Sequence, residues 1–283
     1  MQERIAVVTG ASGGIGMLSA LELARNGFRV VATMRNLTKR TRLDKLAAEQ
    51  QTQKQIEVRR LDVTEFASIR PAIDEIVRVY GRIDALVNNA GFALGGFADD
   101  VSLEELREQL ETNFFGHVEV TKAALPTMRR QRSGHVIMVS SISGVCAQAG
   151  VSSYSASKWA LEGWTEALRI ECQPLGVKVV LVEPGAFKTD VWDVNVHVAR
   201  ASFGESSPNK VRARHFVEYT KNKIVKHDPI QVARLIAAIA RDRNPRLRYV
   251  VGTDAHIQKL LKKVLPWSMY ERLLVRELGL DKE

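Results

Sequence analysis

The chain has 283 residues, of which 45% are hydrophobic and 26% are charged, so its composition is that of a globular protein and excludes a largely disordered one. No apolar run approaches the roughly 20 residues that cross a bilayer, and the first residues, MQERIAVVTG, do not resemble a signal peptide. We therefore expect a cytoplasmic protein. Neither the two cysteines nor the six histidines have the spacing of metal ligands, so no metal site is predicted.

The net charge of +9 is concentrated in the last third of the chain. Residues 191–283 hold 18 basic and 10 acidic side chains, whereas residues 1–190 are nearly neutral. We interpret the basic segment as a solvated helical face, and contact of this tail with an anionic membrane surface is the less favoured alternative. Few aromatic residues stand among its cations to stack on bases, so we expect no nucleic-acid partner.

Up to Gly185 the chain alternates short apolar runs with amphipathic stretches. The pattern predicts strands at 5–10, 28–34, 56–63, 83–91, 134–141 and 177–185. It predicts helices at 14–27, 39–53, 65–80 and 152–171, with two helices or one broken helix at 102–131. Apolar strands separated by helices are typical of a parallel sheet that is covered on both faces.

The pattern loosens in the remaining residues. We expect a substrate lid from about 191 to 209, a helix at 229–242, a strand at 247–252 and basic helices at 253–265 and 267–278. The predicted fold class is α/β: a Rossmann-like, doubly wound parallel sheet of about seven strands, with helices on both faces and a helical C-terminal extension. We expect a single domain over 1–283, with the cofactor-binding and catalytic core at 1–190 and the lid and extension at 191–283.

The stretch TGASGGIG, residues 9–16, lies between the first predicted strand and the first helix. Glycines allow the backbone to approach a ligand closely, and the start of the helix offers unpaired N–H groups to an anion. This combination favours a bound diphosphate. The spacing of its glycines differs from the usual G-x-G-x-x-G dinucleotide motif.

The end of the second predicted strand reads ATMRN, residues 32–36. Sites for NAD usually carry an acidic residue there to bind the ribose 2′-hydroxyl, whereas an arginine accommodates the 2′-phosphate of NADP. Here the position has no acid, and Arg35 is followed by three more cations at 39, 40 and 42. NADP(H) is therefore the expected cofactor, and NAD is the less favoured one.

The stretch YSASK places Tyr154 and Lys158 four residues apart at the start of a predicted helix, so their side chains lie on one face. A free tyrosine has a pKa near 10, too high for a base at neutral pH. A neighbouring ammonium favours the phenolate, so we expect Lys158 to lower the pKa of Tyr154. Such a tyrosine would serve as a general acid–base in carbonyl–alcohol interconversion.

Further motifs follow in a fixed order: LDV (61–63), NNAG (88–91), TNFFG (112–116), VSS (139–141) and EPG (183–185). Together with TGASGGIG and YSASK they resemble the motifs of the short-chain dehydrogenases/reductases over about residues 4–190. The glycine spacing is that family's T-G-x-x-x-G-x-G. Within the family, the chain leans toward the hydroxysteroid and retinol dehydrogenase branch.

The resemblance implies a role for each matching residue. The catalytic set would be Asn113, Ser141, Tyr154 and Lys158, with Ser141 and Tyr154 on the substrate oxygen and Asn113 kinking its helix and holding a water that relays protons to Lys158. Ser140 is the adjacent alternative to Ser141, but strand alternation points it to the other face. The cofactor would contact Gly10, Ser12, Gly14, Ile15, Gly16, Arg35, Asp62, Val63, Asn89, Ala90, Gly91, Tyr154, Lys158, Pro184, Gly185 and Thr189.

We therefore expect an NADP(H)-dependent oxidoreductase that interconverts a carbonyl and a secondary alcohol, with a lipophilic small-molecule substrate. Apolar candidates for the substrate wall are the 95–97 loop, Val145, Phe187 and Trp192. The alternative hypothesis is a regulatory protein of the same fold that senses NADP(H) without turnover. The resemblance also implies a homo-oligomer, a dimer or a tetramer, formed through the helices around 102–131 and 152–171.

Overall fold

A seven-stranded parallel sheet forms the centre of the molecule. The structure is a computed structural model, and it describes residues 3–189, 196–205, 207–222 and 227–280. The strand order is β3-β2-β1-β4-β6-β7-β9. The strands are β1 (Arg4–Val8), β2 (Phe28–Met34), β3 (Ile56–Arg60), β4 (Ala85–Asn88), β6 (Gly134–Val139), β7 (Val177–Pro184) and β9 (Arg248–Val251). The predicted sheet is confirmed.

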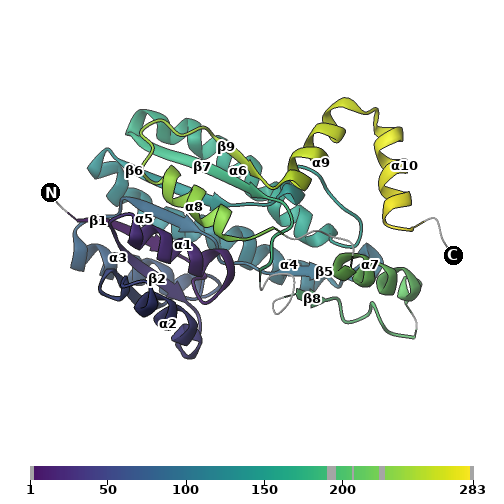
Figure 1. Ribbon diagram of the computed structural model, residues 1–283, viewed down its shortest axis with the longest axis horizontal. Coiled ribbons are helices and arrows are strands. Elements are labelled where there is room, and N and C mark those ends of the chain that lie inside the picture. Colours follow the sequence, from purple (N-terminus) through teal and green to yellow (C-terminus); the bar gives the residue numbers. More distant parts are fainter. Residues whose placement is uncertain (1–2, 190–195, 206, 223–226, 281–283) are drawn as a thin grey trace.

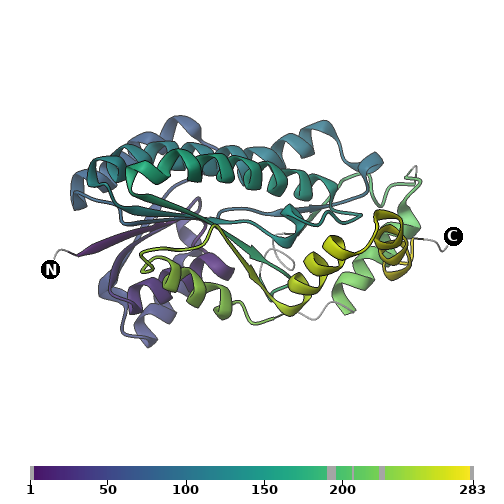
Figure 2. The ribbon, with the colours of Figure 1, turned by 90° about the horizontal axis from the view of Figure 1, so that it is seen from above.

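Helices cover both faces of this sheet (Figure 2). Successive strand residues face opposite sides, so that Ala6 and Val8 belong to one hydrophobic cluster and Val7 belongs to the other. The first cluster is covered by α1 (Gly14–Arg25), α2 (Thr41–Glu49) and α8 (Ile230–Ile239). The second is covered by α3 (Phe66–Tyr80), α5 (Gly116–Gln131) and α6 (Ser152–Cys172). This arrangement confirms the doubly wound fold.

The order of the strands reverses beside β1. From β1 the chain builds β2 and β3 on one side, and then crosses to β4 on the other side. At such a switch point the loops after neighbouring strands diverge and leave a crevice at their carboxyl ends. The loop from β1 to α1 and the loop after β4 border this crevice, and they hold the glycine turn and the NNAG motif.

The segment predicted as two helices or one broken helix is one helix with a π-helical turn in the middle. It consists of α4 (Leu103–Leu110), the π-turn Glu111–Phe115 and α5. A capping box between Ser102 and Glu105 starts α4. Single π-turns often occur at functional sites, and this one contains Asn113.

Two short strands and one helix were not predicted. They are β5 (Ala93–Gly95) and β8 (Val196–Val198), which pair in a separate two-stranded sheet, and α7 (Lys210–Asn222). The strands are too short to show alternation, and α7 has few apolar residues. The predicted lid overlaps residues 190–195 and 206, which lie outside the described residues.

The core of the fold extends past residue 190. Helix α8 packs on α1 in the first hydrophobic cluster, and β9 pairs with β7 as the last strand of the sheet. These elements belong to the central layers of the fold.

The chain ends in a helical hairpin, α9 (Thr253–Val264) and α10 (Trp267–Glu277), far from the N-terminal end (Figure 1). The expected solvated face holds for Lys263, which is exposed. It does not hold for Lys259 and Lys262, which donate hydrogen bonds to the Glu183 carboxylate and the Val145 carbonyl. None of the helices in the described ranges is long and apolar enough to cross a membrane.

Candidate active site

A cleft of about 510 Å³ lies at the carboxyl ends of the central strands. The glycine turn and Arg35 line one part of it, and Ser141, Tyr154 and Lys158 line another part. With one exception, Gly16, all predicted site residues line this cleft: Gly10, Ser12, Gly14, Ile15, Arg35, Asp62, Val63, Asn89, Ala90, Gly91, Asn113, Ser141, Tyr154, Lys158, Pro184, Gly185 and Thr189.

The glycine turn is held in place by hydrogen bonds to the NNAG segment. Gly10 and Gly14 have positive φ angles of 68° and 52°, which only glycine adopts readily. A Cβ on Gly16 would overlap the Asn89 amide and the Gly10 carbonyl, so Gly16 allows the turn to close without lining the cleft. Thr9 Oγ1 accepts hydrogen bonds from the N–H groups of Asn89 (2.9 Å) and Ala90 (3.1 Å).

The start of α1 is open to an anion. Its N-cap residue is Gly13, and in the described chain no side chain caps its first turn. The N–H groups of that turn therefore keep the capacity to bind a phosphate. Next to them, Arg35 and Lys39 line the cleft, whereas Arg40 is bonded to Asp44 at 2.6 Å.

Tyr154 and Ser141 meet at the other part of the cleft. The Tyr154 hydroxyl is hydrogen-bonded to Ser141, whose Oγ also accepts from the Ser143 N–H at 3.1 Å. Burial raises the pKa of Tyr154, and the bond to Ser141 opposes this rise only in part. The net direction is opposite to the expected lowering, because burial outweighs the interactions that favour the phenolate.

Lys158 is almost fully buried. Its Nζ donates to the Val139 carbonyl at 2.9 Å and lies 5.8 Å from the centre of the Tyr154 ring. Burial lowers the pKa of Lys158 to about 8, and the negative charge of Glu162, one helical turn later, acts in the opposite direction. The side chain therefore stays mostly protonated at neutral pH.

Asn113 joins the π-turn to the start of α6. Its amide oxygen accepts from the Phe92 N–H (3.1 Å), and its amide nitrogen donates to the Phe92 carbonyl (3.0 Å) and to Ser157 Oγ (3.2 Å). Ser157 in turn donates to the Tyr154 carbonyl at 2.7 Å. This network orients the first turn of α6, and the water relay to Lys158 stays a prediction.

Ser140 and Ser141 point in different directions, in agreement with strand alternation. The Ser140 hydroxyl faces Glu162 and lowers its pKa, but burial has the larger effect and raises the pKa of Glu162 to about 7. The carboxylate also accepts from Arg248 Nε at 3.1 Å. Ser140 therefore borders the cleft like Ser141, but its hydroxyl faces the buried carboxylate of Glu162.

His117 lies next to the site, bonded to the NNAG segment. His117 Nε2 donates to the Ala90 carbonyl at 2.7 Å, since a carbonyl only accepts. Full burial lowers the pKa of His117 to about 3, so the ring is neutral and structural. In the ranges covered by the structure, no three His, Cys, Asp or Glu side chains converge to hold a metal ion.

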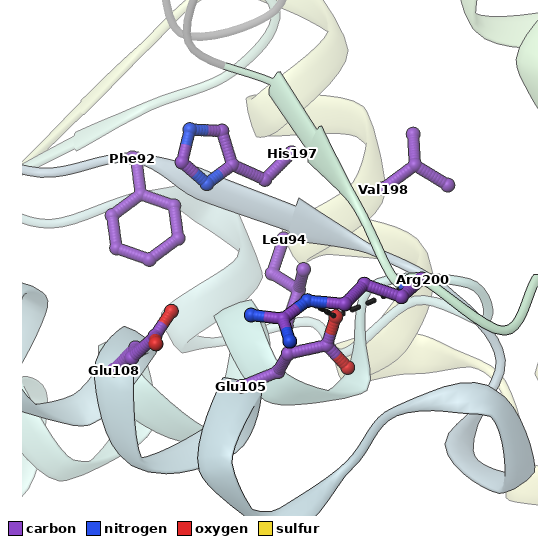
Figure 3. Close-up of a pocket in the computed structure, with 7 residues that line it drawn as sticks. All are labelled: Phe92, Leu94, Glu105, Glu108, His197, Val198 and Arg200. Carbon is purple, nitrogen blue, oxygen red and sulfur yellow. Dashed lines mark hydrogen bonds and ion pairs between the residues drawn. The ribbon is translucent and has the colours of Figure 1, made fainter.

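Sequence reasoning missed a hollow of about 250 Å³ next to the cleft. Phe92, Glu108 and His197 line both spaces, and the Phe92 and His197 rings are 4.8 Å apart. Figure 3 shows Glu105 and Arg200 closing its lower side, where the Arg200 N–H donates to the Glu105 carboxylate at 3.0 Å. Proximity of Phe92 to the NNAG motif was the only signal in the sequence.

The predicted substrate wall is only partly present. Phe187 lines the cleft, whereas Val145 packs against Ile142 and Cys146 behind it. Residues 95–97 do not line the cleft, and Trp192 lies outside the described residues.

The sequence was also compared with known proteins. A family model described as short chain dehydrogenase matches residues 4–197. The chain belongs to the short-chain dehydrogenase family. These enzymes are NAD(P)-dependent oxidoreductases acting on CH–OH groups, and the site above contains their motif residues.

Three curated short-chain dehydrogenases are similar along nearly their whole length. An uncharacterized oxidoreductase of Bacillus subtilis, YusZ, is 40% identical over 98% of this chain and 99% of its own. The 3-ketodihydrosphingosine reductase of Bacteroides thetaiotaomicron is 35% identical over 94% of each chain. Retinol dehydrogenase 8 of Bos taurus is 34% identical over 95% of this chain and 88% of its own.

Solved structures of short-chain dehydrogenases are also similar to this chain. A short-chain dehydrogenase from Streptomyces avermitilis has a TM-score of 0.82 and 31% identity, covering 99% of this chain and 98% of its own. ElxO with NADP bound has a TM-score of 0.71 and 27% identity, covering 89% and 96%.

Proposed function

We propose that this short-chain dehydrogenase is an NADP(H)-dependent oxidoreductase that interconverts a carbonyl and a secondary alcohol on a lipophilic substrate. Tyr154 would be its general acid–base. The observation that carries the proposal is that one cleft is lined by the phosphate-binding turn, by Arg35 and by the Ser141–Tyr154–Lys158 set. A cofactor in the turn and a substrate at Tyr154 would share this space.

The residues fit a phosphorylated dinucleotide. The uncapped start of α1 suits a diphosphate, and the cations Arg35 and Lys39 suit a 2′-phosphate. Asp62, Val63 and the NNAG segment would border the adenine and the centre of the cofactor, and Pro184, Gly185 and Thr189 its nicotinamide. The NADP complex of the similar ElxO supports this choice of cofactor over NAD.

The chemistry would proceed through Tyr154. Bound NADPH would supply the hydride that reduces the carbonyl carbon. The Tyr154 hydroxyl, protonated at neutral pH because its pKa is raised, would give its proton to the carbonyl oxygen. Ser141 would hold that oxygen by a hydrogen bond, and the buried charge of Lys158 would stabilise the phenolate that remains. In the oxidation direction each proton transfer is reversed.

Two observations support a lipophilic substrate. Phe92, Leu94 and Val198 give the hollow beside the cleft an apolar part, and the remaining lining residues are Glu105, Glu108, His197 and Arg200. Two of the similar enzymes are named for 3-ketodihydrosphingosine and retinol, both largely hydrocarbon. We also propose a homo-oligomer, because α4, the π-turn and α6 each expose an apolar side chain: Leu103, Phe115 and Ile170.

Turnover and binding assays with the purified protein test the proposal. We expect oxidation of NADPH, and slower oxidation of NADH, in the presence of long-chain ketones. Tyr154→Phe should lower kcat by about 10²–10⁴-fold and leave the Kd for NADPH unchanged. Tyr80→Phe is a matched control, because the Tyr80 hydroxyl is also bonded, to Glu57, but lies outside the cleft.

Two results would contradict this function. Turnover by Tyr154→Phe at the wild-type rate would exclude Tyr154 as the acid–base. Tight NADPH binding without turnover across a broad panel of ketones, aldehydes and alcohols would favour the regulatory alternative.

A further inference from the structure

The Pro184–Gly185 turn after β7 is tied to helix α9 on both sides. Before the turn, the Glu183 carboxylate accepts a hydrogen bond from Lys259 Nζ at 2.8 Å. After the turn, the Ala186 N–H donates to Asp254 Oδ2 at 2.7 Å. Both partners belong to α9, which lies beyond the residues 4–197 matched by the family model.

Two glycines make room for the Asp254 carboxylate. A Cβ on Gly185 would lie only 2.6 Å from Asp254 Cγ, and a Cβ on Gly252 would lie 2.5 Å from Asp254 Oδ1. Gly252 also has a φ of +104°, a conformation that other residues rarely adopt. The carboxylate thus packs closely against both glycines, although its side chain is 26% exposed.

His227 extends the contact made by Asp254. Its Nε2 lies 3.2 Å from Asp254 Oδ1, and its backbone N–H donates to the Ala186 carbonyl at 2.9 Å. The Lys188 N–H donates to the His227 carbonyl, also at 2.9 Å. Asp254 therefore bonds directly to the segment after the turn and lies close to the residue that pairs with that segment.

Glu183 depends on Lys259 for its charge balance. Its side chain is fully buried, and its two cationic neighbours are Arg248, at 3.1 Å, and Lys259. Arg248 is shared with Glu162 and Glu166. Removing Lys259 would leave the Glu183 carboxylate, directly before the turn, with Arg248 as its remaining cationic neighbour. A buried carboxylate that lacks a cationic partner is strongly unfavourable.

We propose that Asp254 and Lys259 are positioning residues through which α9 holds the Pro184–Gly185 turn in the shape that receives the nicotinamide half of the cofactor. This inference rests on the proposed NADP(H) function. The turn lines the same cleft as Tyr154, and the residues that would bind the 2′-phosphate belong to the loop after β2. Loss of either contact should therefore weaken binding of the nicotinamide half and spare the adenosine half.

Two ligands separate these halves in a binding experiment. NADPH reports the whole site, and adenosine 2′,5′-bisphosphate carries the 2′-phosphate and adenine but no nicotinamide. We expect Asp254→Ala and Lys259→Met to weaken NADPH binding about tenfold, the size of one lost charge-assisted hydrogen bond. Their affinity for adenosine 2′,5′-bisphosphate should stay at the wild-type value, and Asp254→Asn, which keeps the acceptor oxygen, should recover most of the loss.

Lys263→Met is the matched control, because Lys263 is exposed on the same helix. The inference is wrong if Asp254→Ala binds NADPH like the wild type, if Lys263→Met weakens it as much as Lys259→Met, or if both ligands weaken equally. Thermal unfolding shows whether Asp254→Ala is folded. If it is not, the same criteria are applied to Asp254→Asn and Lys259→Met. A wild-type protein that binds neither ligand would instead overturn the proposed function.

Discussion

Lys158 stands one turn from Tyr154 on α6, yet its ammonium nitrogen lies 5.8 Å from the centre of the tyrosine ring and bonds to the Val139 carbonyl. The hydroxyl of Tyr154 is bonded to Ser141 instead. In the proposed mechanism the lysine would therefore act on the tyrosine through space, as a buried positive charge, and not through a direct hydrogen bond. Its protonation state then decides how well a phenolate is stabilised.

This relationship predicts a pH dependence of activity. Because burial lowers the pKa of Lys158 to about 8, its charge is present below that pH and is lost above it. The value of kcat/KM for carbonyl reduction should fall as the pH rises through about 8. Stability should depend on pH in the opposite direction to activity, as far as Lys158 contributes to the free energy of unfolding. Its folded pKa is below the ordinary 10.5, so between these values the unfolded chain binds more protons and stability rises with pH.

Two variants on α6 test whether Lys158 causes the fall in kcat/KM at high pH. The charge of Glu162 raises the pKa of Lys158, so Glu162→Gln should move the fall in kcat/KM to lower pH. Glu171→Gln, an exposed change on the same helix, should leave the profile where it is. A shift of the same size in both variants would contradict the role of Lys158.

The two adjacent serines should differ in their effect on catalysis. Ser141→Ala removes the partner of the Tyr154 hydroxyl, and we expect kcat to fall about 10²–10³-fold, as for the loss of one donor to a reacting oxygen. Ser140→Ala removes a hydroxyl that faces Glu162, so its effect should be much smaller. Steady-state kinetics at pH 7 distinguish the two. Equal losses would mean that strand alternation does not separate their roles.

Most residues of the proposed site were predicted from the resemblance to the short-chain dehydrogenases, and only two of the motifs also determine a local geometry. TGASGGIG specifies a turn that only glycines can make, and YSASK sets Tyr154 and Lys158 one helical turn apart. The pKa direction of Tyr154 could not be predicted in this way. It depends on how deeply the ring is buried and on where the Lys158 hydrogen bond goes, and both follow from tertiary packing.

Long-range pairing also lies outside local sequence patterns. Strands β5 and β8 have three residues each and are joined across about a hundred residues, so neither shows a period by itself. Lys259 looks like one more cation of a basic helix, and only the fold reveals that it pairs with Glu183, 76 residues away. The same holds for Asp254 and Ala186.

Two glycine substitutions should change stability in opposite directions. Gly176 follows α6 with a φ of +76°, and a Cβ there would lie 2.8 Å from the carbonyl carbon of Arg132. Gly176→Ala should lower the free energy of unfolding by about 2 kcal/mol. Gly163 lies within α6 with open space around its Cβ position, so Gly163→Ala should raise it by about 0.5–1 kcal/mol. Urea unfolding measures both, and a stabilising Gly176→Ala would contradict the backbone argument.

Arg35 should set the preference for NADP(H) over NAD(H). A charge-assisted bond to the 2′-phosphate gives about 1.5–3 kcal/mol, so Arg35→Ala should weaken NADPH binding about 10–100-fold and change NADH binding little. Arg35→Asp should reverse the preference, because an acid there suits the ribose 2′-hydroxyl and repels the phosphate. Arg40→Ala is the control, since Arg40 is bonded to Asp44 and does not line the cleft. Titration of nicotinamide fluorescence measures each Kd, and equal losses for NADPH and NADH in Arg35→Ala would show that Arg35 does not bind the 2′-phosphate.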